Sequence, residues 1–263
     1  MYSSLCGYYG ETFMFWFILI FIALFGLLVG SFLNVVIYRL PLGQELTKIN
    51  SHCFSCGSQI KWYDNIPLVS YTLLRGRCRV CKSKISIQYP IVEALNSILW
   101  ILIYVKYQLS IETLIYCIMT SVLLALAVID LKTFEIPRVF NIILVIIGLV
   151  YTCIDYNNFI NHLVGLVCVS GVLFILWFIS AGRWVGFGDV LLMASTGIIV
   201  GWQSVIVGFY IGCVLVILIY LPVMKILNFL KNKFAFGPYL SAGIYLSIFV
   251  TSYVVQLFIT LLG

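Results

Sequence analysis

The sequence predicts an all-α polytopic membrane protein of about eight transmembrane helices, interrupted by one polar insertion. Of the 263 residues, 63% are hydrophobic and only 9% are charged, and the mean hydropathy is +1.14. Soluble globular domains carry about 25% charged residues, so lipid is the expected solvent of this chain. A spanning helix needs about 20 apolar residues, and such runs recur along the sequence between short segments that hold most of the ionisable groups.

The apolar runs set the order of the predicted helices. They cover residues 13–38, 91–105, 112–130, 138–154, 160–182, 189–201, 204–224 and 238–262. The second and sixth runs are short for a full crossing, so we expect tilting, extension into a flank, or a position partly below the membrane surface. The polar stretch 39–90 is predicted to be an insertion between the first and second helices.

The distribution of Lys and Arg predicts the orientation. If the first helix runs from outside to inside, all but one of the 15 Lys and Arg residues fall on one side, and only Lys106 falls on the other. Positive charge is retained on the cytoplasmic side, so we expect the N-terminus outside and the insertion in the cytoplasm. This topology accounts for the net charge of +6 without a nucleic-acid partner. A secretory signal fits less well, because the first apolar run is too long and no Lys or Arg precedes it.

Four cysteines in the insertion form a metal-binding pattern. Two CxxC pairs, separated by 21 residues, comprise Cys53, Cys56, Cys78 and Cys81. Each pair turns the backbone so that two thiolates face one centre, and two pairs complete the closed tetrahedral shell that structural Zn²⁺ prefers. The alternative of two disulfides is disfavoured by a cytoplasmic location. The sequence therefore predicts a small zinc-ribbon-like insertion whose metal is structural, because four cysteines leave no position for a catalytic water.

Two aspartates at helix ends are the candidate catalytic residues. Asp130 ends the third predicted helix, and Asp189 begins the sixth, within Gly186-Phe187-Gly188-Asp189. A charged side chain at the bilayer centre costs about 2.5–3.5 kcal/mol on insertion scales, so acids at membrane depth are candidates for function. The predicted topology puts both aspartates on the cytoplasmic side, where they can face each other.

A pair of facing carboxylates predicts the chemistry of an aspartic peptidase. Two carboxyl groups at hydrogen-bonding distance share one proton, so the ionised member can take a proton from water while the protonated member polarises the scissile carbonyl. Gly186 and Gly188 are the candidate substrate-binding residues, since a backbone without Cβ lets an extended peptide approach closely. Each aspartate also has a plain structural interpretation: Asp189 as a helix N-cap, and Asp130 as an interfacial residue paired with Lys132.

Helix dipoles predict that the two members of the pair differ. Asp130 lies at a helix C-terminus, which is the negative end, whereas Asp189 lies at an N-terminus with free N–H donors. We therefore expect Asp130 to hold the shared proton and Asp189 to be ionised, although the protonation steps belong to the pair.

Further short motifs accompany the aspartates in a fixed order. They are Gly30 to Pro41 at the end of the first helix, Asn65-Ile66-Pro67 between the cysteine pairs, Ile85-Ser86 and Tyr89 to Glu93 after them, Ile136-Pro137, and Phe236 to Leu240. With the GxGD motif and the cysteines, this order resembles the prepilin peptidases, also called type IV leader peptidases, which are membrane aspartic proteases. Leu191 and Arg138 depart from the pattern, because many members have Lys and an acid at or near these places.

The resemblance implies an activity and a cellular setting. Members cleave the basic leader of type IV prepilins or pseudopilins at the cytoplasmic face of the bacterial inner membrane. Members with the cysteine-bearing insertion commonly also methylate the new N-terminus with S-adenosylmethionine. The chain would then divide into a first transmembrane helix (1–38), a zinc-binding insertion (39–90) and a transmembrane aspartic peptidase domain (91–263).

Two other classes of function stay open from the sequence. An ion-coupled membrane transporter would depend on the acids but cleave no peptide. A zinc-ribbon membrane assembly scaffold would need the four cysteines and tolerate replacement of the aspartates by asparagine.

Overall fold

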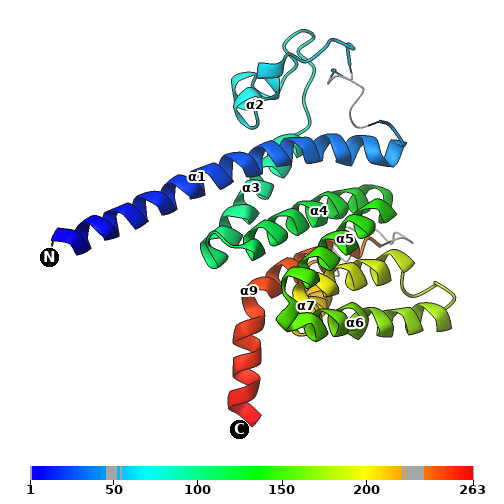
Figure 1. The fold of residues 1–263 in the computed structure, drawn as a ribbon. Coiled ribbons are helices and arrows are strands. Elements are labelled where there is room, and N and C mark those ends of the chain that lie inside the picture. The colour runs from blue at the N-terminus through cyan, green and yellow to red at the C-terminus, as the bar shows by residue number, and fades with distance from the viewer. Residues whose placement is uncertain (1, 46–51, 54, 221, 223–233, 263) are drawn as a thin grey trace. The chain divides into compact units, whose positions relative to one another are not determined.

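The computed structural model describes all residues except 1, 46–51, 54, 221, 223–233 and 263 (Figure 1). The described residues form helices and contain no named strand, only isolated antiparallel bridges between His52 and Gln59 and between Arg77 and Lys84. This confirms the predicted all-α class. The chain divides into two compact units, Met1–Ser121 and Val122–Gly263, so that the boundary falls inside one helix, α4. The three-part division expected from the sequence stays a prediction.

The helices follow the predicted order along the chain. The first unit begins with α1 (Tyr2–Arg39), η1 (Leu40–Leu42), η2 (Trp62–Asn65), α2 (Val69–Leu73) and α3 (Gln88–Tyr107). Helix α4 (Ile111–Thr133) starts in this unit and ends in the second. The second unit continues with α5 (Arg138–Ile154), η3 (Tyr156–Asn158), α6 (Phe159–Ile179), α7 (Phe187–Leu215), the π-helix η4 (Val216–Tyr220) and α9 (Gly237–Leu262).

Six stretches of the described chain are long and apolar enough to cross a membrane. They are Thr12–Leu42, Gln88–Tyr107, Ile111–Thr133, Tyr156–Ile179, Phe187–Tyr220 and Gly237–Leu261. Helix α5 is apolar but has only 17 residues. The predicted runs 189–201 and 204–224 fall in the single stretch Phe187–Tyr220, and the last residues of the second run, 221, 223 and 224, lie outside the described residues. Lys48, Lys225, Lys231 and Lys233, which contributed to the predicted orientation, also lie outside them.

In the first unit, α1 and α3 pack closely through small residues. A Cβ on Gly26 would lie 2.9 Å from Ser97 Cα, and one on Gly30 would lie 2.7 Å from Glu93 Cα. Ser97 Oγ also donates a hydrogen bond to the Ala23 carbonyl at 2.8 Å. Close approach at small residues, combined with interhelical hydrogen bonds, is a usual way for helices to associate in lipid, where burial from water supplies no driving force.

Helix α7 in the second unit is broken at Gly201. This residue has φ 80° and ψ 169°, a conformation that glycine adopts without strain. The second half of α7 packs against α9, where a Cβ on Gly208 would lie 3.0 Å from Ile244 Cα, and one on Gly212 3.3 Å from Leu240 Cα. The second half runs antiparallel to α9, because Gly208 faces Ile244 while Gly212, further along α7, faces Leu240 nearer the start of α9. The non-helical residue Gly201 is also the last residue of the predicted run 189–201.

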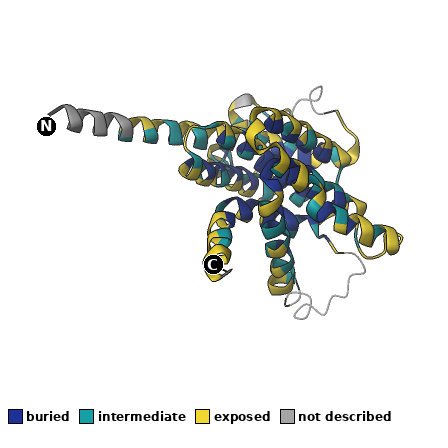
Figure 2. Cartoon of the chain, turned by 60° about the horizontal axis from the view of Figure 1, so that its bottom comes forward, coloured by how far each residue is buried: buried dark blue, intermediate teal, exposed yellow. Residues whose placement is uncertain are grey.

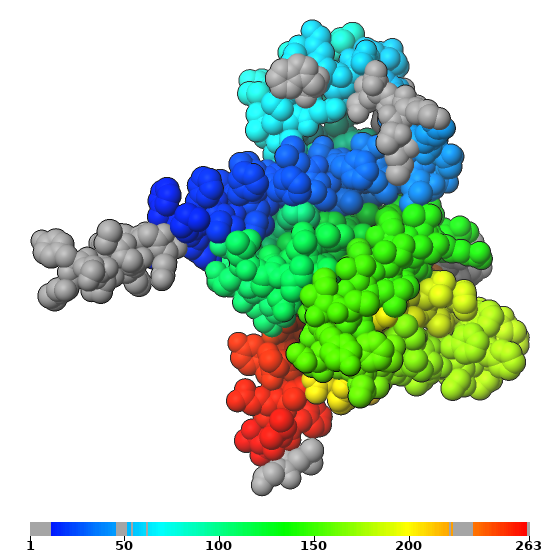
Figure 3. All heavy atoms as spheres, viewed as in Figure 1, coloured from blue at the N-terminus to red at the C-terminus, as the bar shows by residue number. Residues whose placement is uncertain are grey.

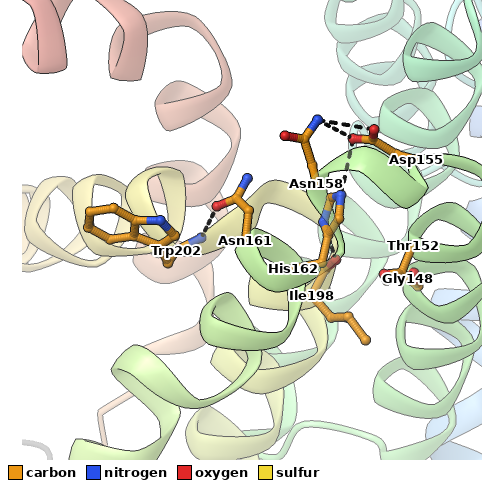
Figure 4. Close-up of polar contacts among 8 residues, drawn as sticks. All are labelled: Gly148, Thr152, Asp155, Asn158, Asn161, His162, Ile198 and Trp202. Atoms are coloured by element: carbon orange, nitrogen blue, oxygen red, sulfur yellow. Dashed lines mark hydrogen bonds and ion pairs between the residues drawn. The ribbon is translucent and has the colours of Figure 1, made fainter.

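Two neighbouring residues of α6 bind the backbone groups that this break leaves free (Figure 4). In an uninterrupted helix the Trp202 N–H would donate to the Ile198 carbonyl. Here the Trp202 N–H donates to Asn161 Oδ1 at 3.2 Å, and His162 Nδ1 donates to the Ile198 carbonyl at 2.9 Å. The other nitrogen of the His162 ring lies 3.3 Å from Asp155 Oδ2. Both groups of the missing backbone hydrogen bond thus have side-chain partners.

Buried and exposed residues are distributed as expected for a bundle of helices in lipid. Figure 2 shows buried residues on the faces that helices turn toward one another and exposed residues on the outward faces. Many of the exposed side chains are large and apolar, including Ile142, Ile146, Val167 and Phe178. Outward apolar faces of this kind suit contact with lipid.

Candidate active site and metal centre

The end of α4 places Asp130 inside the second unit. Asp130 is only 4% exposed. Helix α4 ends three residues later, where Phe134 takes a left-handed φ of 56° and donates its N–H to the Asp130 carbonyl at 2.9 Å. The chain then turns through Ile136 and Pro137 into α5.

The start of α7 places Asp189 beside a glycine backbone. The N-cap of α7 is Gly186, so the structural interpretation of Asp189 as the N-cap is wrong, and Asp189 is the third residue of the helix. Its carboxylate accepts a hydrogen bond from the Gly186 backbone, as an acid at this position does in a capping box. A Cβ on Gly186 would lie 3.1 Å from Asp189 Oδ2. Gly186 is therefore in contact with the candidate catalytic carboxylate.

The second glycine of the motif brings the α4–α5 connection against α7. A Cβ on Gly188 would lie 3.0 Å from Ile136 Cβ. The predicted role of Gly186 and Gly188 in substrate binding stays a prediction, and each glycine also has a packing reason to lack a side chain.

A third helix contributes to the surroundings of Asp130. The N–H of Gly237, the first residue of α9, donates to Asp130 Oδ2 at 2.9 Å. Each aspartate therefore faces a helix N-terminus, Asp189 that of its own helix and Asp130 that of α9. The expected difference between the two aspartates was based on their own helices alone, so its premise is incomplete. Which carboxyl group holds the proton stays a prediction.

The four cysteines of the insertion come together in the first unit. Their sulfur atoms all lie within 4.8 Å of one another, and those of Cys53 and Cys81 are 3.8 Å apart. A tetrahedral zinc site with Zn–S bonds of about 2.3 Å has S···S edges of about 3.8 Å, so this donor set fits zinc. Figure 3 shows the insertion, in cyan, as a compact lobe. The cluster can hold a metal ion, as the spacing of the cysteines predicted.

The two CxxC turns repeat the same backbone pattern 25 residues apart. The Cys53 N–H donates to Ser58 O and the Cys78 N–H donates to Ser83 O, both at 2.9 Å. The residue after each second cysteine has a left-handed φ, 69° at Gly57 and 58° at Lys82. Each turn therefore presents its two thiols in the same way.

Backbone donors favour the form of Cys53 that binds metal. The N–H groups of Cys56 and Ser55 lower the pKa of the Cys53 thiol to about 6. The thiolate is the species that coordinates a metal ion, so the turn favours the metal-binding form of Cys53 even without a metal ion.

Comparison with known proteins decides the family. A family model described as "Type IV leader peptidase family" matches residues 117–221, and one described as "Bacterial Peptidase A24 N-terminal domain" matches residues 24–107. A prepilin leader peptidase/N-methyltransferase from Neisseria gonorrhoeae is 33% identical over 252 residues, which are 84% of this chain and 86% of the relative. One from Pseudomonas putida is 32% identical over 82% of this chain and 85% of the relative. This chain belongs to the type IV leader peptidase family.

A third relative shares only part of its length with this leader peptidase family member. The Myxococcus xanthus prepilin leader peptidase/N-methyltransferase is 33% identical over 210 residues, 78% of this chain but 61% of that protein. No solved structure matches the chain. The family assignment confirms the resemblance found from the motifs, and it favours a peptidase over the transporter and scaffold alternatives.

The sequence did not predict one residue that contacts the candidate site, Gly237. The Gly237-Pro238 pair reads as a turn into the last helix, and the structure does begin α9 there. The contact with Asp130 joins positions 107 residues apart. The only available signal was the place of the Phe236 to Leu240 motif in the ordered set.

Proposed function

We propose that this chain is a membrane aspartic endopeptidase that removes the basic leader of type IV prepilins or pseudopilins, with Asp130 and Asp189 as its catalytic pair. One observation carries the assignment of residues. Two aspartates from distant helix ends are buried in a leader peptidase family member, Asp130 at 4% and Asp189 at 9% exposure. Burial of two acids is costly and is typical of functional sites, and a pair that shares one proton would lower that cost.

The chemistry follows from the two protonation states. The ionised carboxylate takes a proton from a water molecule, whose oxygen attacks the carbonyl carbon of the scissile peptide bond. The protonated carboxyl group donates a hydrogen bond to the carbonyl oxygen as negative charge develops there. Transfer of a proton to the amide nitrogen then releases the new N-terminus, without a covalent intermediate.

The glycines beside Asp189 support a role in substrate binding. Without a Cβ at Gly186 or Gly188, the backbone of an extended peptide can come close to the carboxylates. An extended segment is what a prepilin would present between its leader and the hydrophobic helix that follows it.

The relatives' name includes a second activity, and we propose it for this chain as well. The new N-terminal amine would be methylated with S-adenosylmethionine as the donor. Zn²⁺ bound by Cys53, Cys56, Cys78 and Cys81 would stabilise the insertion, since a four-thiolate shell is closed to substrate. Transfer of a labelled methyl group from the donor to a cleaved pilin-like peptide tests this activity, and absence of label would contradict it.

The setting that we propose is the bacterial inner membrane, with the N-terminus outside and both the active site and the insertion in the cytoplasm. Its support is the one-sided distribution of Lys and Arg. Reporter fusions in the insertion and in the α5–α6 connection test it. A periplasmic report from the insertion would contradict the orientation.

The decisive experiment is cleavage of a prepilin-like precursor by the purified full chain in lipid. We expect Asp130→Asn and Asp189→Asn each to lower kcat by about 10²–10⁴-fold, the contribution of general acid–base catalysis. Asp155→Asn is the matched control, because Asp155 belongs to the same unit but pairs with His162 at the helix break. Wild-type cleavage by both catalytic variants would overturn the assignment.

A further inference from the structure

We infer that Gly237, the first residue of α9, is a positioning residue for the catalytic carboxylate of Asp130. The inference rests on the proposed function, because it assigns the start of α9 a role in orienting a catalytic group of that reaction. Helix α9 also lies beyond the region 117–221 that the leader peptidase family model matches.

The first turn of α9 has one free N–H group, and that group binds Asp130. The first N–H groups of a helix have no partner within the helix and need one elsewhere. At this helix start, Tyr239 and Leu240 donate their N–H groups back to the Phe236 carbonyl, at 3.1 and 3.2 Å. Pro238 has no N–H. The remaining donor is the Gly237 N–H, and it lies 2.9 Å from Asp130 Oδ2.

A side chain at the same position would displace the Asp130 carboxylate. A Cβ on Gly237 would lie 2.7 Å from Asp130 Oδ2, closer than real Cβ atoms approach other atoms, and 3.3 Å from the carboxylate carbon. Gly237 is buried, and it is not among the glycines with positive φ. Backbone conformation therefore does not explain the glycine, whereas contact with the carboxylate does.

The two catalytic carboxylates are held in parallel ways. Asp189 Oδ2 would be 3.1 Å from a Cβ on Gly186, and Asp130 Oδ2 would be 2.7 Å from a Cβ on Gly237. In each case a glycine at a helix start lies against one oxygen. For Asp130 the hydrogen bond fixes Oδ2 and so sets the direction of the other oxygen, Oδ1. Since a displacement of about 1 Å in a catalytic group can cost 10²-fold in rate, this contact is expected to matter for turnover.

The test compares two Gly→Ala variants in the purified full chain, with cleavage of a prepilin-like precursor as the assay. We expect Gly237→Ala to lower kcat by about 100-fold with KM little changed, because the carboxylate moves and the peptide-binding surface does not. Gly171→Ala in α6 is the matched control. Its Cβ would meet one methyl group of Val167 in the same helix, at 3.3 Å, and no group of the candidate site, so we expect wild-type kcat.

The possible outcomes separate this inference from the proposed function. The positioning role is overturned if Gly237→Ala has wild-type kcat, or if only its KM rises. The Asp130→Asn variant tests the catalytic pair separately. If Asp130→Asn cleaves normally, the proposed function fails. If Gly237→Ala does not fold, the wild-type glycine is observed instead, by the amide resonance of Gly237 in ¹⁵N-glycine-labelled protein. We expect the chemical shift of this resonance to differ between the wild type and Asp130→Asn. An unchanged chemical shift overturns the inference.

Discussion

The cysteine cluster of the first unit and the aspartate pair of the second are built over different distances along the chain. The cluster takes its four thiols from two short turns with the same hydrogen-bond pattern. The aspartate pair takes its carboxylates from the ends of α4 and α7 and a backbone donor from α9. A site made of local turns depends on a few residues beside it, whereas a site made of helix ends depends on how whole helices pack. The two sites should therefore respond differently to substitution.

Loss of one zinc ligand should give the largest effect. Cys78→Ser leaves three thiolates, and apparent binding free energies for structural zinc in small peptides are about 10–16 kcal/mol, so we expect the insertion to lose both metal and fold. Metal analysis and limited proteolysis near Arg75 and Arg77 measure this. Asp189→Asn serves as the control and should keep its zinc. Wild-type protein without zinc would contradict the metal assignment.

A distant packing change should reach the aspartate pair but not the cysteine cluster. A Cβ on Gly165 in α6 would overlap the Gly197 carbonyl in α7, so Gly165→Ala must displace the first half of α7. We expect a loss of about 1–3 kcal/mol in stability, as for other overpacked sites, with slower cleavage and unchanged zinc content. Thermal unfolding and the cleavage assay report the two effects. Normal cleavage would show that the site tolerates a shift of α7.

One glycine from each region gives a smaller, matched comparison. Gly186→Ala places a Cβ 3.1 Å from Asp189 Oδ2, whereas Gly57→Ala places one in open space at a residue with φ 69°. We expect about a tenfold fall in kcat from Gly186→Ala, roughly the 1.4 kcal/mol of a slightly misplaced group. Gly57→Ala should cost about 1 kcal/mol in the insertion only, from the left-handed backbone. If Gly57→Ala slowed cleavage as much as Gly186→Ala, the two regions would not be independent.

The smallest expected effect concerns an ion pair on the insertion. Arg79 Nη2 lies 2.6 Å from Asp64 Oδ1 and holds the pKa of that carboxyl below its ordinary value. A lowered pKa contributes stability above the ordinary Asp pKa of about 3.9 and loses it as pH falls through the lowered value, so the contribution is complete at pH 7. The Arg79 side chain is half exposed, so we expect Arg79→Gln to lower the stability of the insertion only slightly. The temperature of zinc release during thermal unfolding at pH 7 measures the effect, and a loss as large as that from Cys78→Ser would contradict a surface pair.

The difference in construction also explains what the sequence could predict. The spacing of the four cysteines predicted that their thiols come together, because spacing within a turn is a local property. Asp130 and Asp189 were proposed from their places at the ends of apolar runs, and their catalytic role stays a prediction. Gly237 was not proposed, because its contact with Asp130 depends on how α9 packs. The N-cap interpretation of Asp189 was wrong by three residues, since the sequence allows a helix to begin at any of several positions there. The sequence predicted two separate runs, 189–201 and 204–224, where the structure has the single helix α7, Phe187–Leu215, with non-helical backbone at Gly201.

The break in α7 has a consequence for how the protein is made. Helix α6 precedes α7 in the chain, so Asn161 and His162 are synthesised before Gly201. The side-chain partners of the Trp202 N–H and the Ile198 carbonyl therefore exist before the broken helix does. A peptide group without a partner costs several kcal/mol in hydrocarbon. In this chain the order of synthesis supplies those partners first.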